Sequence, residues 1–136
     1  MEFGEKIKKL RKEKKLTQEE LAAAVGLSAR AIQNYEQKNV SPRKREIYRK
    51  LADALGVETS VLLTDEEEFV VEAHEKYGSR GANEAEELVS RISGLFAGGE
   101  VPEDTKDEVM QAIQNAYWVA KKINKKYTPK KYRKDE

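Results

Sequence analysis

Side chains that can hydrogen-bond the edges of nucleic-acid bases share one face of a helix predicted over residues 28–38. On a helical wheel, an arc of about 140 degrees holds Arg30, Gln33, Asn34 and Gln37, together with the methyl group of Ala29. A guanidinium can bond guanine, and a carboxamide adenine, through two hydrogen bonds in the major groove of DNA. We therefore predict that Arg30 contacts guanine. Gln33 and Asn34 are assigned to adenine or a phosphate, and the Ala29 methyl group to thymine.

A cluster of cations stands where the next predicted helix begins. Arg43, Lys44 and Arg45 crowd its first turn, although the helix dipole disfavours cations there by about 0.3–1 kcal/mol each. A bound phosphate would reverse that cost, because free backbone amides and basic side chains would then converge on one anion. We predict that Arg43 and Lys44 contact the DNA backbone, which positions a protein without specifying sequence.

Apolar residues at helical spacing and capping signals predict five short helices that position these side chains. The first covers about residues 2–14. The second runs from a capping box of Thr17 and Glu20 to Gly26, and the third from Ser28 to Gln37 or Lys38. The fourth is predicted from a Ser41-Pro42 cap to Gly56, and a short fifth spans residues 61–63. Together they make a complete small domain.

The second half of the chain is also predicted to be helical. A second capping box, Thr64 with Glu67, starts a sixth helix that ends at Gly78, and the segment GSRGAN is expected to act as a hinge. Another helix then runs to Gly98-Gly99, and Pro102 starts a long last one. Its apolar seam is predicted from the following spacing: Val109, Ile113, Ala116, Ala120 and Ile123. This seam should pair with the preceding helix as an antiparallel hairpin.

Trp118 lies about 200 degrees around the last helix from Ala116, on the side opposite the predicted seam. A hairpin alone would leave its ring exposed. Two interpretations remain open, since the ring either packs elsewhere within the chain or anchors an interface. Trp118 and its neighbour Tyr117 are therefore our candidates for a dimer or partner interface.

The segment LTQEELAAAVGLSARAIQNYE resembles the phage-repressor-like (Xre/Cro) helix-turn-helix family. The matching positions are Leu16, Thr17, Gln18, Leu21, Ala22, Gly26, Leu27, Ser28, Ile32 and Glu36, with LADALGV at residues 51–57 in support. The resemblance covers about residues 5–63 and implies five helices, the third lying in the DNA major groove. It also implies that Gln18 and Ser28 contact phosphates, with Lys38 in the following loop as a further candidate.

Composition and charge exclude several other classes of protein. Zero cysteines and one histidine rule out disulfides, thiolate metal sites and multi-histidine sites. No stretch is apolar enough to span a membrane or to act as a signal peptide, so we expect a cytoplasmic protein. No pair of acid, base or nucleophile groups forms a recognisable motif, so we expect no enzyme, no cofactor and no bound metal. The net charge of +1 conceals blocks of +5, −10 and +6 over residues 1–63, 64–120 and 121–136.

These observations predict an all-α protein with a five-helix lambda-repressor-like domain and a helical C-terminal extension containing an antiparallel hairpin. We assign residues 1–63 to DNA binding, 64–126 to a dimerisation or effector module and 127–136 to a basic tail. The predicted function is a sequence-specific transcriptional regulator, most simply a repressor, acting as a homodimer on a palindromic operator. The alternative is an antitoxin-like regulator, or one controlled by a protease or anti-repressor, whose C-terminal hairpin binds a partner protein.

Overall fold

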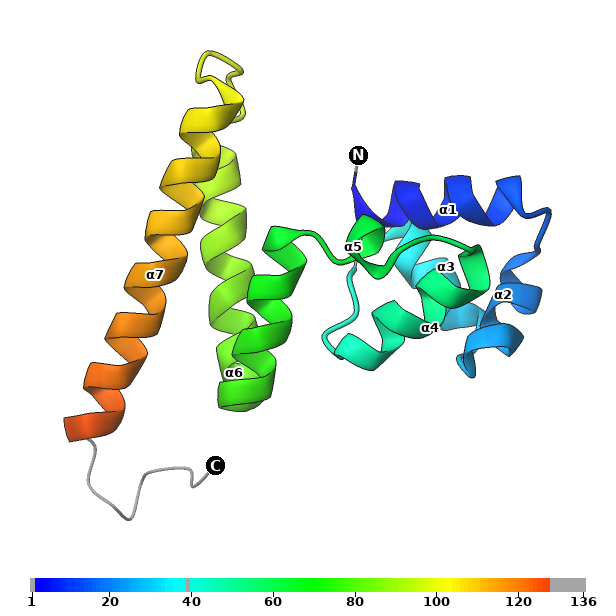
Figure 1. The fold of residues 1–136 in the computed structure, drawn as a ribbon, viewed down its shortest axis with the longest axis horizontal. Helices are drawn as coiled ribbons and strands as arrows, with labels where there is room; N and C mark the ends of the chain where they lie inside the picture. Colours follow the sequence, from blue (N-terminus) through cyan, green and yellow to red (C-terminus); the bar gives the residue numbers. More distant parts are fainter. Residues whose placement is uncertain (1, 39, 128–136) are drawn as a thin grey trace. The chain divides into compact units, whose positions relative to one another are not determined.

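Every element among the described residues, 2–38 and 40–127, is a helix (Figure 1). The computed structural model contains α1 (Phe3–Glu13), α2 (Gln18–Val25), α3 (Ala29–Gln37), α4 (Arg45–Leu55), α5 (Thr59–Leu62), α6 (Asp65–Leu95) and α7 (Glu103–Tyr127). The all-α prediction is confirmed. The chain divides into two compact units, residues 1–82 and 83–136, which are described separately below.

Local capping signals set the ends of α2 and α3 as predicted. Thr17 and Glu20 form both halves of a capping box at the start of α2, and the hydroxyl of Ser28 accepts a hydrogen bond from the Ala31 amide at 3.1 Å. Helix α2 ends at Gly26, which is left-handed. Only residues 26–28 therefore separate α2 from α3, and this short connection fixes the direction in which α3 leaves the domain core.

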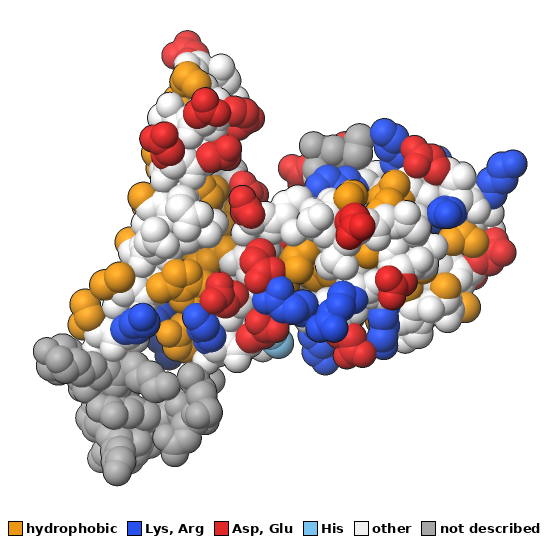
Figure 2. Space-filling view, in the orientation of Figure 1, with side chains coloured by type: hydrophobic (Ala, Val, Ile, Leu, Met, Phe, Trp, Pro, Cys, Tyr) orange, Lys and Arg blue, Asp and Glu red, His pale blue; other side chains and the backbone are white. Residues whose placement is uncertain are grey.

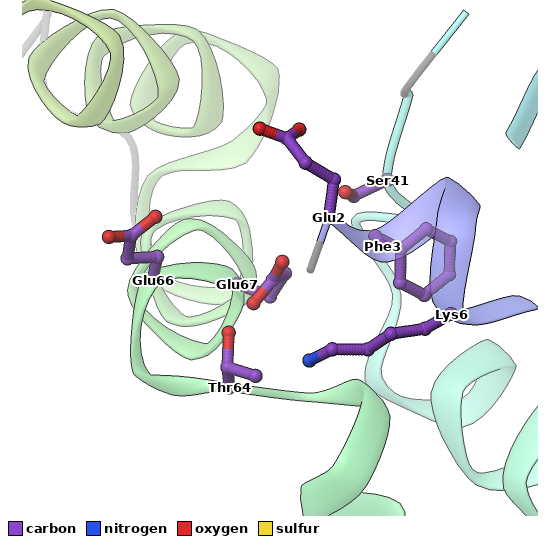
Figure 3. Close-up of a pocket in the computed structure, with 7 residues that line it drawn as sticks. All are labelled: Glu2, Phe3, Lys6, Ser41, Thr64, Glu66 and Glu67. Atoms are coloured by element: carbon purple, nitrogen blue, oxygen red, sulfur yellow. The ribbon is translucent and has the colours of Figure 1, made fainter. Parts of the chain in front are cut away.

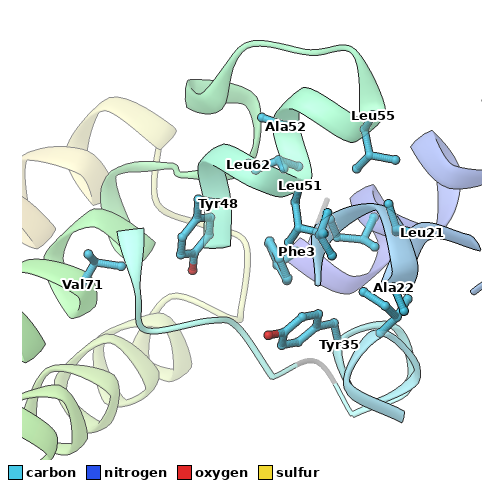
Figure 4. Packing of buried hydrophobic residues seen from close by; sticks show 13 residues of the cluster. Phe3, Leu21, Ala22, Tyr35, Tyr48, Leu51, Ala52, Leu55, Leu62 and Val71 are labelled. Atoms are coloured by element: carbon cyan, nitrogen blue, oxygen red, sulfur yellow. The ribbon is translucent and has the colours of Figure 1, made fainter. Parts of the chain in front are cut away.

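A single apolar core holds the first unit together (Figure 4). It draws one or more buried side chains from each of α1 to α6, including Ile7, Leu21, Ile32, Leu51, Leu62 and Val71. Phe3 lies in its middle, with its ring edge-on to Tyr35 at 5.7 Å and to Tyr48 at 5.6 Å between centroids. Burial of aromatic pairs in this geometry contributes both apolar area and favourable ring electrostatics. Because Val71 belongs to this cluster, the core includes part of α6.

The predicted start of the fourth helix is wrong. Helix α4 begins at Arg45, with Lys44 as an N-cap residue that makes no side-chain capping bond, whereas the sequence predicts a start at Ser41-Pro42. The physical reason lies in a tertiary contact: Pro42 is buried, and its carbonyl accepts a 2.7 Å hydrogen bond from the hydroxyl of buried Tyr48. This contact holds residues 41–43 outside the helix.

Helix α6 breaks at the residue predicted to end the sixth helix. Gly78 has φ 71° and ψ −159°, a conformation open almost only to glycine. The predicted six-residue hinge is wrong, however, because helical structure resumes directly after Gly78. Gly81 then packs so closely that a Cβ there would lie 2.6 Å from the Ala73 carbonyl oxygen. The break is therefore one residue long, and the chain is tightly packed three residues after it.

In the second unit, residues 83–95 of α6 and helix α7 form the predicted antiparallel hairpin (Figure 1). The face of α7 in this contact differs from the predicted seam. Gln114 and Tyr117 are 8% exposed, and the Tyr117 hydroxyl donates to a Glu84 carboxylate oxygen at 3.0 Å. Ala116, Ala120 and Ile123 of the predicted seam are exposed instead. The hairpin contact is therefore made by Tyr117, whose side chain is large and ends in a hydroxyl, and not by the small Ala116 and Ala120.

No helix of the part of the chain that the structure describes is long and apolar enough to cross a membrane. The predicted basic tail, residues 127–136, lies outside the described residues except for the backbone of Tyr127, which ends α7.

Candidate nucleic-acid interface

Helix α3 has one face in the core and one face in solvent. Ile32 and Tyr35 are 0% and 9% exposed and anchor the buried side. Because these two side chains and the Ser28 cap fix the rotation of the helix, the opposite side is presented outward without freedom to turn. The helix is nine residues long, a length that fits within the major groove of DNA.

The predicted base-reading residues lie on that solvent side to different degrees. Arg30, Gln33 and Gln37 are exposed, and Gln33 Nε2 lies 3.5 Å from Gln37 Oε1. Asn34 is half-buried. Ala29 is also half-buried and packs against the core cluster. The guanidinium and two of the carboxamides are therefore the groups most open to a ligand.

A buried ion pair that the sequence analysis did not anticipate ties α1 to α3. Arg11 Nε and Glu36 Oε2 are 2.7 Å apart, a second bond of 2.9 Å joins Arg11 to Glu36 Oε1, and the Glu36 side chain is 2% exposed. Burial raises the pKa of Glu36, but hydrogen bonds from Arg11 and Gln18 outweigh it and hold that pKa below its ordinary value. The hydrogen bonds that Arg11 donates to Glu36 in turn raise the pKa of Arg11. The spacing of the two residues along the chain carries no local signal for this pair.

Gln18 belongs to this network. Its Nε2 donates to Glu36 Oε1 at 3.2 Å, so the side chain at the first turn of α2 is held in one orientation. Ser28 is exposed with its hydroxyl in the α3 cap, and Lys38 is exposed as the last capping residue of α3. Three residues that the family resemblance assigned to phosphate contacts therefore stand at the two ends of α3 and the start of α2.

The three cations before α4 have different surroundings. Lys44 is exposed at the N-cap, and Arg43 is half-buried just before it. Arg45 is held within the chain: its guanidinium donates two bonds to Glu68, at 2.6 and 2.7 Å, and further bonds to Glu75 at 3.0 and 3.2 Å. Those hydrogen bonds raise the pKa of Arg45. The helix-dipole cost at Arg45 is thus offset inside the molecule by two carboxylates, and the assignment of Arg43 and Lys44 to a phosphate stays a prediction.

The first unit also contains an open polar pocket of about 330 Å³ (Figure 3). Residues from the starts of α1 and α6 line it, among them Glu2, Lys6 and Glu67, and none of the predicted DNA-contacting residues does. Burial raises the pKa of Glu67, and hydrogen bonds from its own and the Thr64 backbone only partly oppose this. Lys6 donates to the Val61 carbonyl at 3.1 Å. Within the described residues no group of acidic or histidine side chains could hold a metal ion.

The predicted interface residues of the second unit lie next to each other on α7. Tyr117 is buried inside the hairpin, and its ring meets the Trp118 ring edge-on at a centroid distance of 5.2 Å. Trp118 is half-buried. The Tyr117 hydroxyl and the Lys121 ammonium group both bond Glu84 at 3.0 Å, so Tyr117 serves the packing of this chain.

A rigidly capped helix that exposes a guanidinium and carboxamides, preceded by a short turn and a packed helix, defines a helix-turn-helix protein. The family model for this motif, described as "Helix-turn-helix", matches residues 7–62. The whole chain is 33% identical over 144 aligned residues to the "Immunity repressor protein" of Bacillus phage phi105, covering 100% of this chain and 99% of that protein. The chain therefore belongs to the phage-repressor-like helix-turn-helix family of DNA-binding regulators. No solved structure matches it at a significant level.

Proposed function

We propose that the protein is a sequence-specific transcriptional repressor that binds a palindromic operator as a homodimer and reads base edges with α3. The observation that carries this proposal is the solvent side of α3, where Arg30, Gln33 and Gln37 are exposed on a helix anchored by Ile32 and Tyr35. The match to a phage immunity repressor along the whole chain supports a repressor rather than an isolated DNA-binding module.

In the proposed complex, the contacts fall into two groups. Base edges are contacted by Ala29, Arg30, Gln33, Asn34 and Gln37, and phosphates by Gln18, Ser28, Lys38, Arg43 and Lys44. Because Glu36 holds the Gln18 side chain in place, the phosphate contact at the start of α2 is formed with little loss of side-chain freedom. A homodimer is needed because one small domain of this kind buries too little surface for tight specific binding.

Replacement of Arg30 by Ala tests the assignment of α3. Loss of a two-bond guanine interaction should weaken operator binding by about 1–3 kcal/mol per half-site and flatten the preference at one base position. The measurement is selection of bound DNA from a random pool, carried out in parallel with the parent and the Arg30→Ala protein.

Lys50→Ala is a matched control, because Lys50 is an exposed cation on α4 that pairs with Glu46 at 3.4 Å and lies outside the proposed interface. The control should keep the parental sequence preference. Identical base preferences in the parent and the Arg30→Ala protein would exclude Arg30 as a base-reading residue.

A second candidate function rests on the exposed apolar side chains of α7, Val119 and Ile123, which are 57% and 51% exposed. They fit an antitoxin-like regulator, or one controlled by a protease or anti-repressor, whose hairpin binds a different protein. Purification of the full chain with its co-encoded neighbours, followed by size determination of any complex, distinguishes this function from a homodimer.

A further inference from the structure

Helix α7 has a second apolar face, on the side away from the hairpin contact. Its side chains are exposed in the part of the chain that the structure describes. Val119 and Ile123 are the large members of this face. Ala112, Ala116 and Ala120 are exposed beside them, and the five positions fall within an arc of about 100 degrees. Figure 2 shows hydrophobic side chains along the free edge of α7. We call these five residues the outer face.

The outer face is separate from the contact that forms the hairpin. Helix α7 packs within its unit through Gln114 and Tyr117, which lie about 100 to 160 degrees around the helix from the middle of the outer face. Since Tyr117 and Lys121 complete the hairpin through Glu84, the second unit does not need the outer face for its own packing. A continuous exposed apolar strip of this kind is typical of an interaction surface.

The charges that border the outer face are arranged with opposite signs at its two ends. Along one border, Asp104 and Glu108 lie in the first two turns of α7 and Lys122 lies near its end, all three exposed. The sequence KKINKK at residues 121–126 carries four lysines and no acidic residue, while residues 103–108 carry four acidic residues and one lysine. The border is therefore complementary to itself when the direction of the helix is reversed.

We propose that the outer face of α7 binds the outer face of a second copy of this chain, with the two helices antiparallel. A two-fold axis close to residue 115 then places Glu108 of one copy beside Lys122 of the other copy, and Asp104 one turn further along. In a parallel pair this border would face the opposite border of the second copy, so its acidic and basic ends would not meet each other. The inference rests on the proposed function, since an antiparallel helix pair supplies the two-fold symmetry that a palindromic operator requires.

The sizes of the side chains agree with this arrangement. Ala112 and Ala116 lie beside the proposed axis, where their small size lets the two helices approach closely. The larger Val119 and Ile123 lie away from the axis and cover the space between the helices toward the ends. These two side chains, in place of Trp118 and Tyr117, are therefore the anchors of the proposed interface.

Sedimentation of the full chain at tens of micromolar tests the surface. The parent should sediment at twice the chain mass of 15.5 kDa. Val119→Glu should sediment at the single-chain mass, because it places a carboxylate among the apolar side chains of the proposed interface. Val61→Glu is the matched control: Val61 is 42% exposed on α5, outside the outer face, and this variant should remain dimeric. Circular dichroism checks that both variants keep the parental helix content.

A charge exchange tests the antiparallel orientation. Glu108→Lys and Lys122→Glu alone should each weaken the dimer about 10-fold at low salt, because each sets like charges together twice in a symmetric pair. The double variant should return to parental affinity, since the swapped charges face each other again across the antiparallel pair. Lack of rescue in the double variant overturns the antiparallel arrangement.

Two results overturn the surface itself. A monomeric parent at these concentrations excludes a second copy as the occupant, and a dimeric Val119→Glu protein places the dimer contact elsewhere. Binding of each variant to DNA carrying a single half-site is measured alongside. If Val119→Glu keeps single-site binding but remains dimeric, the inference fails while the proposed function stands. If the parent binds no DNA sequence preferentially, the proposed function fails whatever the sedimentation shows.

Discussion

Among single residues, Glu36 links α3 to the rest of its domain. Its carboxylate receives Arg11 of α1 through two bonds and Gln18 of α2 through one, so three helices meet at a group that is 2% exposed. A carboxylate that is nearly desolvated is favourable only while its bonds are all made. The pair therefore makes the placement of α3 sensitive to any change in one partner.

Glu36→Gln should lower the free energy of unfolding by about 3 kcal/mol, because it leaves the largely buried Arg11 guanidinium without its counter-charge. Urea unfolding at neutral pH measures the change. Glu46→Gln is the control, since the exposed Glu46 pairs with Lys50 on the helix surface, and it should cost no more than about 0.5 kcal/mol. Equal effects of the two variants would contradict a stabilising role for the buried pair.

The same carboxylate gives the stability difference a defined pH dependence. The folded-state pKa of Glu36 is lowered, so its contribution is present above the unfolded-state pKa of about 4.3 and is lost as the pH falls through the folded-state value. The difference between the parent and Glu36→Gln should therefore be constant near neutral pH and shrink below about pH 4. If this stability difference grows as the pH falls, the pKa of Glu36 is raised in the folded state and not lowered.

The cations before α4 allow a separate test of phosphate binding. Joint replacement of Arg43 and Lys44 by Gln should weaken binding to all DNA sequences alike and reduce the slope of log affinity against log salt by about 0.9 for each phosphate interaction removed. Arg45→Gln is the contrast, because Glu68 and Glu75 already hold that guanidinium. It should lower stability and leave the salt slope at its parental value. An unchanged slope in the Arg43 and Lys44 variant would move the phosphate-binding site to another part of the surface.

At the scale of helices, the sequence predicted those features that neighbouring residues determine by themselves. The caps at Thr17 and Ser28 depend on side chains within one turn of the amides they bind, so their pattern is readable without the fold. The start of α4 depends on a bond between the Tyr48 hydroxyl and the Pro42 carbonyl inside the core. No local pattern contains that bond, and the capping signal at Ser41 was therefore misleading.

The face of α7 was mispredicted for a related reason. The helix carries two apolar arcs, and periodicity alone does not state which arc packs within the chain. The ring of Tyr117 and its bond to Glu84 decide the matter, because a buried tyrosine needs a partner for its hydroxyl and α6 supplies one. In the candidate DNA interface, the solvent side of α3 was predictable from a wheel, whereas the bonds from Arg11 and Gln18 to Glu36 required the tertiary structure.

The break in α6 depends on a backbone conformation at Gly78 that is open almost only to glycine. Gly78→Ala should destabilise the protein by about 1–3 kcal/mol, because its backbone conformation is strained for any residue with a Cβ even though open space surrounds the position. Gly94→Ala makes the same chemical change later in α6, in an ordinary helical conformation with equal space. It should stabilise by up to about 1 kcal/mol. The midpoint of thermal unfolding is measured for both variants. If both midpoints shift in the same direction, α6 does not depend on the break.

For the molecule as a whole, the sequence and the structure place the boundary between its two halves at different residues. The sequence placed the end of the DNA-binding domain at residue 63, where the family resemblance ends. The structure groups residues 1–82 as one compact unit. Phe69, Val71 and Ala73 of α6 are at most 2% exposed, and Val71 is part of the core cluster. Part of α6 thus buries apolar area together with α1 to α5.

Truncation tests where the domain ends. A chain cut after Ala82 should fold, bind a single half-site and sediment as a monomer, since it lacks the outer face of α7. A chain cut after Leu63 should be less stable by at least about 2 kcal/mol, because it loses the buried Phe69 and the core member Val71 and deprives Arg45 of both carboxylate partners. Urea unfolding of the two chains under identical conditions makes the comparison. If both unfold at the same denaturant concentration, α6 contributes nothing to the DNA-binding domain, and residue 63 is its boundary.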